Sequence, residues 1–176
     1  MLFDFIYRVL LTLNATSWLI VVYGIKESWQ LFSIPHWWMA AILLMFPVCL
    51  TLISIFISKW LEKDAIGNAK ECELADNEFL PVYLGYFFVA LSINDCFTMV
   101  VVYAIVFVFT WLTQALYFNP LFLLFGYHFY HVTTQHGTRV FVAVRGKVVR
   151  NVRNIDLSNL RRVNDMTYIA AKGAKR

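Results

Sequence analysis

Four long stretches of this chain contain no Lys, Arg, Asp or Glu: residues 9–25, 28–58, 79–94 and 96–138. A helix rises about 1.5 Å per residue, so about 20 apolar residues cross a hydrocarbon layer about 30 Å thick. The chain has 176 residues and is 15% charged, whereas a soluble domain carries about 25% charged residues. Much of the chain is therefore expected to face lipid.

The charge-free stretches predict four membrane-spanning helices, at about residues 5–25, 37–60, 79–93 and 97–117. Asn94 and Asp95 predict a tight turn between the last two. The alternative is one long helix that holds Asp95 in the bilayer centre, at a cost of about 2.5–3.5 kcal/mol. Residues 121–132 are too short to span, so we expect them to lie along the interface or to extend the fourth helix past a kink.

Small polar residues within the first two predicted spans indicate contacts between helices. Asn14 lies near the middle of the first span and is expected to hydrogen-bond a neighbouring helix. Thr51, Ser54 and Ser58 follow each other at helical spacing, so they share one face of the second span and predict a helix–helix contact there. The polar loop at residues 59–78 is expected to form a short surface helix in its middle.

The tail from residue 133 onward changes character. Apolar residues alternate along 139–145, which predicts a strand, and residues 148–152 can return as the second strand of a hairpin. Asp156 is expected to cap a short helix with Leu157, Leu160 and Val163 on one face. The predicted fold is therefore an all-α integral membrane protein with four transmembrane helices in residues 1–132. A small basic α+β tail (133–176) follows, too small for an independent core.

The distribution of basic residues predicts how the chain is oriented. With four spans, Arg8, three lysines of the 59–78 loop and ten Lys and Arg of the tail lie on one side, and only Lys26 lies on the other. Basic residues are retained in the cytoplasm. Both termini are therefore predicted to be cytoplasmic.

Few residues suggest catalytic chemistry. His128 and His131 would share a face of a helix, with His136 nearby, and such a group can bind a metal. The favoured interpretation is that these histidines lie among aromatic residues in the headgroup layer. Phosphate-binding, zinc-protease and nucleophile-elbow motifs are absent from the sequence. We therefore predict no enzyme activity, no catalytic residue, no cofactor and no metal.

The basic tail has three interpretations: a topology signal, attraction to anionic lipid, or a docking surface for a partner. Direct sequence-specific nucleic-acid binding is not expected, because no recognition motif is present. A different class of function is a small oligomeric ion channel or transporter. Its pore would be lined by Asn14, Thr51, Ser54, Thr113 or Gln114.

Three passages carry a resemblance to a known family: residues 79–88 (FLPVYLGYFF), 125–132 (FGYHFYHV) and 137–142 (GTRVFV). The chain resembles KwaA, the membrane subunit of the bacterial Kiwa anti-phage defence system. The resemblance implies a homo-oligomer, expected to be a tetramer, in the bacterial inner membrane. It also implies a sensor that detects phage attack at the envelope and engages a cytoplasmic DNA-binding partner subunit (KwaB).

Two sets of residues are predicted to carry this role. The partner-binding surface is expected to comprise basic residues of the tail: Arg139, Arg145, Lys147, Arg150, Arg161 and Arg162. The outward-facing sensing surface is expected to comprise Trp29, His36 and Trp37, which flank the loop between the first two spans.

Overall fold

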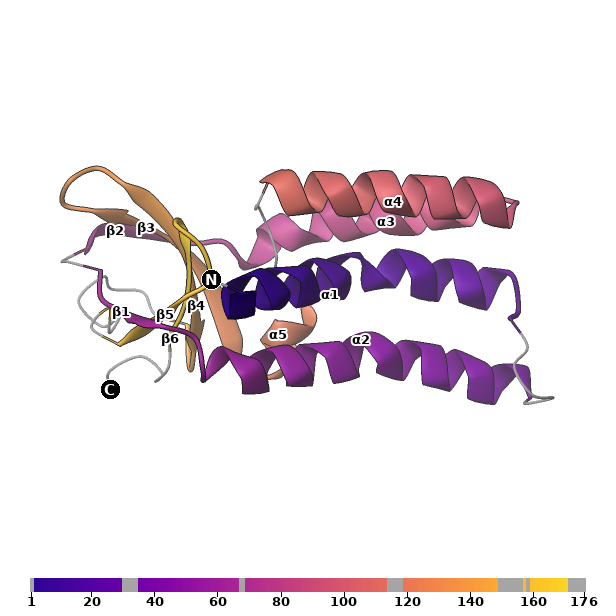
Figure 1. The fold of residues 1–176 in the computed structure, drawn as a ribbon, viewed down its shortest axis with the longest axis horizontal. Helices are drawn as coiled ribbons and strands as arrows, with labels where there is room; N and C mark the ends of the chain where they lie inside the picture. Colours follow the sequence, from indigo (N-terminus) through magenta and orange to yellow (C-terminus); the bar gives the residue numbers. More distant parts are fainter. Residues whose placement is uncertain are drawn as a thin grey trace. The chain divides into compact units, whose positions relative to one another are not determined.

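The computed structural model describes residues 2–29, 35–66, 69–113, 119–148, 157 and 159–170 (Figure 1). The chain divides into two compact units, each built from separated segments. A helical unit comprises residues 8–54 and 79–119. A sheet unit comprises residues 1–7, 55–78 and 120–176. The polar loop between the second and third helices is therefore part of the sheet unit.

Helices occur at all four positions that the charge-free stretches indicate: α1 (Leu2–Lys26), α2 (His36–Ser58), α3 (Phe79–Ser92) and α4 (Cys96–Thr113). Among the described residues, three helices are long and apolar enough to cross a membrane, namely α1, α2 and α4. The 14 residues of α3 rise only about 21 Å at 1.5 Å per residue, short of the hydrocarbon layer. The length of α3 therefore does not establish a fourth span.

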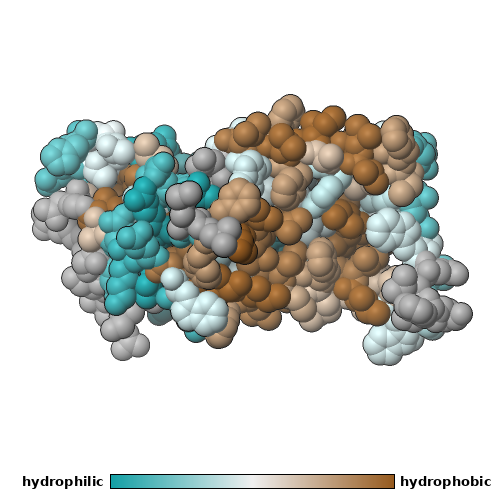
Figure 2. Space-filling model, in the orientation of Figure 1, coloured by the Kyte–Doolittle hydropathy of each residue, from teal (hydrophilic) through white to brown (hydrophobic). Residues whose placement is uncertain are grey.

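Within the helical unit, α1 is the central helix. Half of the residues in the most apolar stretch of α1 are buried inside the protein, compared with 6% in that of α4. Leu19 and Tyr23 of α1 pack with Ala90, Ile93 and Met99 in a core cluster between α1, α3 and α4. The face of the helices seen in Figure 2 is strongly hydrophobic, and large apolar side chains are exposed on each of α1 to α4. A helix that is apolar on all sides is suited to lipid rather than water.

The helical structure is interrupted between α3 and α4, as predicted from the turn residues Asn94 and Asp95. Asp95 is exposed, and its Oδ1 accepts a hydrogen bond from the Thr98 backbone N–H at 2.8 Å. This is the geometry of a helix N-cap. Asp95 thus begins α4, and the alternative of one long helix through Asp95 is wrong.

The sheet unit contains a six-stranded sheet in the order β1-β5-β6-β4-β3-β2. All neighbouring strands are antiparallel except β4 and β6. The strands are β1 (Lys63–Asp64), β2 (Ala69–Leu74), β3 (Tyr127–Thr134), β4 (Arg139–Arg145), β5 (Leu160–Arg162) and β6 (Thr167–Ala170). Two short helices accompany them, the 3-10 helix η1 (Asp76–Glu78) and α5 (Leu121–Leu124).

The two faces of this sheet pack differently. One face holds an aliphatic core built on Val132, Val140, Val142 and Val144. The other face is aromatic. There the Phe129 and Phe141 rings stack with centroids 5.7 Å apart, and Phe122 of α5 meets Phe129 edge-on. Because side chains alternate between the faces of a strand, β3 and β4 contribute to both cores.

Several sequence predictions for this region are wrong. The protein is not all-α outside a small tail, because residues 127–134 form β3 instead of an interfacial or kinked helix. Residues Leu160–Arg162 form β5, so the helix predicted around Leu157 and Val163 does not exist there. The reason for the first error is that β3 is buried on both faces. Its apolar residues therefore show no two-residue period, and a short apolar run does not distinguish strand from helix.

The prediction of a surface helix in the polar loop at 59–78 is also wrong. The middle of this loop forms β2 rather than a surface helix, and β2 pairs with the distant strand β3, with Leu74 opposite Tyr130. The predicted hairpin between 139–145 and 148–152 also differs from the structure. The strand at 139–145 is β4, and it pairs with β3 on one side and β6 on the other. Of the predicted return strand 148–152, the structure describes Val148 alone. Gln114, Arg150 and Asp156 lie outside the described residues.

Candidate functional site

The three residues predicted to form the sensing surface line one cavity in the helical unit. Trp29 follows the end of α1, and His36 and Trp37 begin α2. The cavity has a volume of about 330 Å³, and its lining includes the apolar side chains of Met39 and Leu43. The structure thus brings together residues that the sequence separates by a loop, in a concave site with two indole rings.

The end of α1 explains the position of Trp29. The Trp29 N–H donates to the Gly24 carbonyl at 3.1 Å, and the Ser28 N–H donates to the Ile25 carbonyl at 3.1 Å. Ser28 has a positive φ of 49°. These features define a Schellman motif, which reverses the chain at a helix C-terminus. A Cβ on Gly24 would lie 3.0 Å from a ring carbon of Trp29, so any larger residue at this position would crowd the ring.

Lys26, at the end of α1, forms hydrogen bonds with the turn between α3 and α4. Its Nζ donates to the Ile93 carbonyl and to Asn94 Oδ1, the latter at 3.0 Å. Glu27 lies 3.5 Å from the same ammonium group. The one basic residue on the predicted outward side therefore connects the end of α1 to the turn between α3 and α4.

A buried polar cluster lies deeper in the helical unit. Asn14 Nδ2 donates to Thr51 Oγ1 at 3.1 Å, as the sequence predicts for a contact between the first two helices. Asn119 Nδ2 donates to both the side-chain and backbone oxygens of Asn14 at 3.1 Å. Trp18 Nε1 donates to Asn119 Oδ1 at 3.0 Å. Asn14, Thr51 and Asn119 are fully buried, so the cluster holds α1, α2 and the Asn119 segment together.

This arrangement does not favour a pore within one protomer. Asn14 and Thr51 bond to each other rather than facing an open path, and the Ser54 hydroxyl donates to the Leu50 carbonyl. The Thr113 hydroxyl donates to the Phe109 carbonyl at the end of α4. Hydrogen bonds made inside the protein are the expected state of polar groups at membrane depth.

The histidines of the sheet unit have carboxylate partners from η1. His128 Nδ1 lies 2.7 Å from Asp76 Oδ2, and His131 Nε2 lies 3.0 Å from both Glu78 oxygens. Because β3 is a strand, residues three apart point to opposite faces. The premise that His128 and His131 share a face is therefore wrong. Within the described residues, no group of three or more His, Cys, Asp or Glu could hold a metal.

The basic residues predicted to bind a partner fall into two groups. Arg139, Arg145, Lys147 and Arg162 are exposed. Arg139 pairs with Glu73 at 2.9 Å, Arg162 pairs with Asp165, and the Arg145 guanidinium lies 6.0 Å from the Tyr127 ring centroid. Arg161 differs, because its Nη1 donates to the Leu61 carbonyl at 2.6 Å and its Nε is buried. Arg161 therefore connects β5 to the chain that precedes β1.

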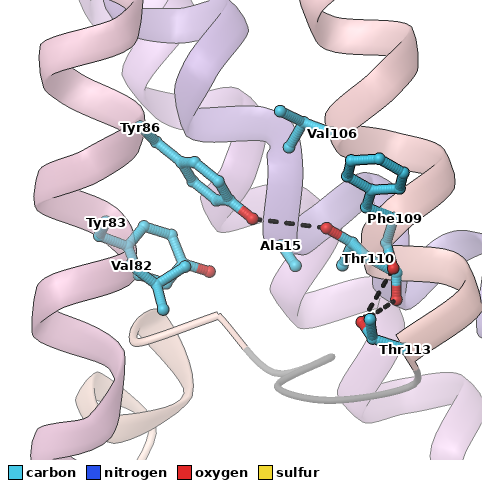
Figure 3. A pocket seen from close by; sticks show the side chains of 8 residues that line it. All are labelled: Ala15, Val82, Tyr83, Tyr86, Val106, Phe109, Thr110 and Thr113. Atoms are coloured by element: carbon cyan, nitrogen blue, oxygen red, sulfur yellow. Dashed lines mark hydrogen bonds between the residues drawn. The ribbon is translucent and has the colours of Figure 1, made fainter.

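A second cavity, of about 300 Å³, was missed by the sequence reasoning. It lies among α1, α3 and α4 and is lined on one side by Tyr83 and Tyr86 and on the other by Thr110 and Thr113 (Figure 3). Each pair is three residues apart on a largely apolar helix. This spacing places both hydroxyls of a pair on one helix face, and it is the signal that would have found the cavity.

The structure thus defines a small membrane-associated protein, with an apolar helical unit and a basic sheet unit. The family model of the anti-phage protein KwaA matches residues 7–169, and the chain belongs to this family. The match confirms the resemblance noted in the sequence. Comparison with curated proteins and with solved structures finds no match. Family membership gives the protein a role in anti-phage defence, in a system with other subunits.

Proposed function

We propose that this protein is the membrane-embedded sensor of an anti-phage defence system. It detects attack at its outward aromatic cavity and engages a cytoplasmic DNA-binding effector subunit through its sheet unit. The observation that carries the defence role is the family match over residues 7–169. The assignment of sensing to the helical unit and of partner binding to the sheet unit is supported by the cavity at Trp29, His36 and Trp37 and by the exposed basic residues of the sheet.

Pairing of β2 with β3 supports a four-span topology. These strands precede α3 and follow α4, and Leu74 pairs with Tyr130 in one sheet. The chain between them must therefore leave and return to the same side of the membrane. If α4 crosses, α3 crosses in the opposite direction, and local bilayer thinning accommodates its short length.

The same reasoning supports the orientation. Residues 1–7, 55–78 and 120–176 belong to one unit, so they lie on one side. That side carries nearly all the basic residues, which the positive-inside rule assigns to the cytoplasm. The protein is thus a multi-pass protein of the bacterial inner membrane with both termini cytoplasmic. The basic residues of the sheet unit also favour contact with anionic lipid.

The outer faces of the helices support self-association. Large apolar side chains such as Phe46, Phe88 and Phe97 are exposed on α2, α3 and α4. Such surfaces are covered either by lipid or by another protomer. We propose a homo-oligomer, with the tetramer of the related family as the expected form, that acts without catalysis, cofactor or metal of its own.

Partner capture tests the effector half of the proposal. Deleting the chain after His136 is unsuitable, because it removes β4, β5 and β6 and with them the sheet core. The better test is tagged full-length protein carrying Arg145→Glu and Lys147→Glu, purified from gently solubilised membranes. The matched control is Lys70→Glu, which reverses an exposed charge on β2 outside the predicted surface.

We expect the wild type and the control to retain a stoichiometric cytoplasmic partner, and the double variant to lose it. Retention of the partner by the double variant would remove the assigned surface. If the full-length protein purifies only with itself and the reconstituted oligomer conducts ions, the channel alternative replaces the sensor.

Phage challenge tests the sensing half. Trp29→Ala and Trp37→Ala remove the two indoles of the outward cavity, and we expect both to abolish protection at unchanged membrane levels. Trp60→Ala is the control, because Trp60 is a similarly exposed tryptophan of the sheet unit. Full protection by the Trp29→Ala and Trp37→Ala variants would show that the cavity is not the sensing surface.

A further inference from the structure

The cavity between α1, α3 and α4 contains an unused hydrogen-bonding group. Tyr83 is 6% exposed, and its hydroxyl has no hydrogen-bond partner among the residues that the structure describes. Figure 3 shows Tyr83 and Tyr86 extending from α3 into the space in front of α4. The Tyr86 hydroxyl lies 3.5 Å from Thr110 Oγ1, so that pair is already engaged. A buried hydroxyl without a partner costs free energy, and a ligand that accepts its hydrogen bond removes this cost.

The polar groups of the cavity lie close to the ends of their helices. Tyr83 is four residues into α3, which corresponds to about 6 Å of helix rise. Thr110 and Thr113 are in the last turn of α4. Val106 lies about 10 Å deeper than Thr113 by the same rise. The cavity therefore has hydroxyls at the depth where headgroups meet acyl chains and an apolar wall further in.

The rim of the cavity opens to the lipid-facing surface. Phe109 lines the cavity and is nevertheless 62% exposed, and its neighbours Val108 and Leu112 are exposed on the same helix. An occupant that reaches the cavity past Phe109 comes from the bilayer rather than from water. Its chemistry must combine an apolar chain with a hydrogen-bond acceptor placed at interfacial depth.

We propose that this cavity is a binding site for a diacyl phospholipid of the membrane. An ester carbonyl accepts the hydrogen bond of the Tyr83 hydroxyl, and an acyl chain lies along Val82, Val106 and Phe109. The volume of about 300 Å³ is at the small end of ligand pockets. It therefore accommodates part of one chain and the ester group rather than a whole lipid. This inference is independent of the sensor role proposed above.

Native mass spectrometry of the full-length protein with matched lipids tests the proposal. The probes are an ester-linked and an ether-linked phosphatidylglycerol of equal chain length, which differ in the carbonyl acceptor. We expect the wild type to retain the ester lipid about threefold to tenfold better than the ether lipid, the range of one net hydrogen bond. Tyr83→Phe should abolish this preference. Tyr103→Phe is the control, because the Tyr103 hydroxyl bonds Thr16 and lies outside the cavity lining.

A second pair of variants tests the acyl-chain wall. Val106→Phe fills the cavity and should reduce retention of both lipids, whereas Val108→Phe adds the same bulk on the exposed face of α4 and should not. Equal retention of ester and ether lipids by the wild type would overturn the proposal. So would a photo-crosslinker at Phe109 that captures a second copy of the chain instead of lipid, because the cavity would then be a protomer contact.

Discussion

The two units of this protein bury their apolar side chains against different partners. In the sheet unit, Phe129 and Val142 are fully buried inside the protein, and exposed positions such as Arg139 carry charge. In the helical unit the reverse holds, since Phe97 is 78% exposed while Asn14 is fully buried. Apolar and polar side chains thus occupy opposite positions in the two units, as expected if water surrounds the sheet unit and lipid surrounds the helical unit.

The comparison shows what stabilises each unit. Removing apolar surface from water drives the sheet unit together. In lipid this driving force between helices is absent, so close packing and interhelical hydrogen bonds take its place. The polar cluster of Asn14, Thr51 and Asn119 is accordingly a central contact of the helical unit.

The largest expected effect on stability comes from comparing a buried phenylalanine of the sheet unit, Phe129, with an exposed one of the helical unit, Phe97. Phe129→Ala should destabilise the sheet unit by about 3–5 kcal/mol, because it leaves a cavity between Phe122 and Phe141. Phe97→Ala should have little effect, since this side chain is 78% exposed and its removal leaves no cavity inside the protein. Thermal unfolding in detergent compares the two variants, and equal losses would break the distinction between the units.

An intermediate effect is expected at the polar cluster. Asn14→Leu removes the side-chain hydrogen bonds that Asn14 makes with Thr51 and Asn119 in a fully buried cluster, which should cost about 1–3 kcal/mol. Thr113→Val is the control, because its hydroxyl is exposed and bonds within its own helix. Resistance to denaturation in mixed micelles provides the measurement. A neutral Asn14→Leu would mean that packing alone holds the helices.

A further difference in stability is expected when Arg161, which bonds within the sheet unit, is compared with its exposed neighbour Arg162. Arg161→Met should lower the unfolding free energy by about 1–3 kcal/mol, because it removes a bond to the Leu61 carbonyl at a partly buried site. Arg162→Met should cost about 0–1 kcal/mol, the usual range for an exposed ion pair such as that with Asp165. Thermal unfolding compares them. Similar stability of both would leave Arg161 available for a partner.

The smallest effect concerns pH at the turn between α3 and α4. Hydrogen bonds from Thr98, first of all its backbone N–H, lower the pKa of Asp95. A lowered pKa contributes stability above the unfolded value of about 3.9, and the contribution is lost as pH falls through the folded pKa. The protection of the first amides of α4 against hydrogen exchange, relative to the intrinsic exchange rate at each pH, should therefore be constant from pH 8 to about 5 and fall only in acid.

Asp95→Asn provides the control for this prediction. Asparagine caps a helix about as well as aspartate but does not titrate in this range. The variant should therefore keep its protection in acid. A variant that loses protection in parallel with the wild type would assign the pH effect to another group.

Much of the helical unit could be predicted from the sequence, but less of the sheet unit. The positions of α1 to α4, the turn at Asp95 and the Asn14 contact follow from local charge, spacing and capping. The pairing of β2 with β3 does not, because Glu71 and Glu73 look like a solvated loop until β3 lies beside them. Among the predicted site residues, Trp29, His36 and Trp37 share a cavity, whereas Arg161 is engaged internally.

Local sequence is sufficient to predict the membrane character, the positions of the helices along the chain and the charge difference between the helical and sheet units. These properties depend on runs of residues near each other, since a charge in hydrocarbon is costly wherever the chain folds. Only the tertiary contacts bring the 59–78 loop and the tail into one sheet and leave the Tyr83 hydroxyl, at a cavity, without a partner among the described residues. Pairing between distant strands and the fit of three helices depend on contacts that no local pattern encodes.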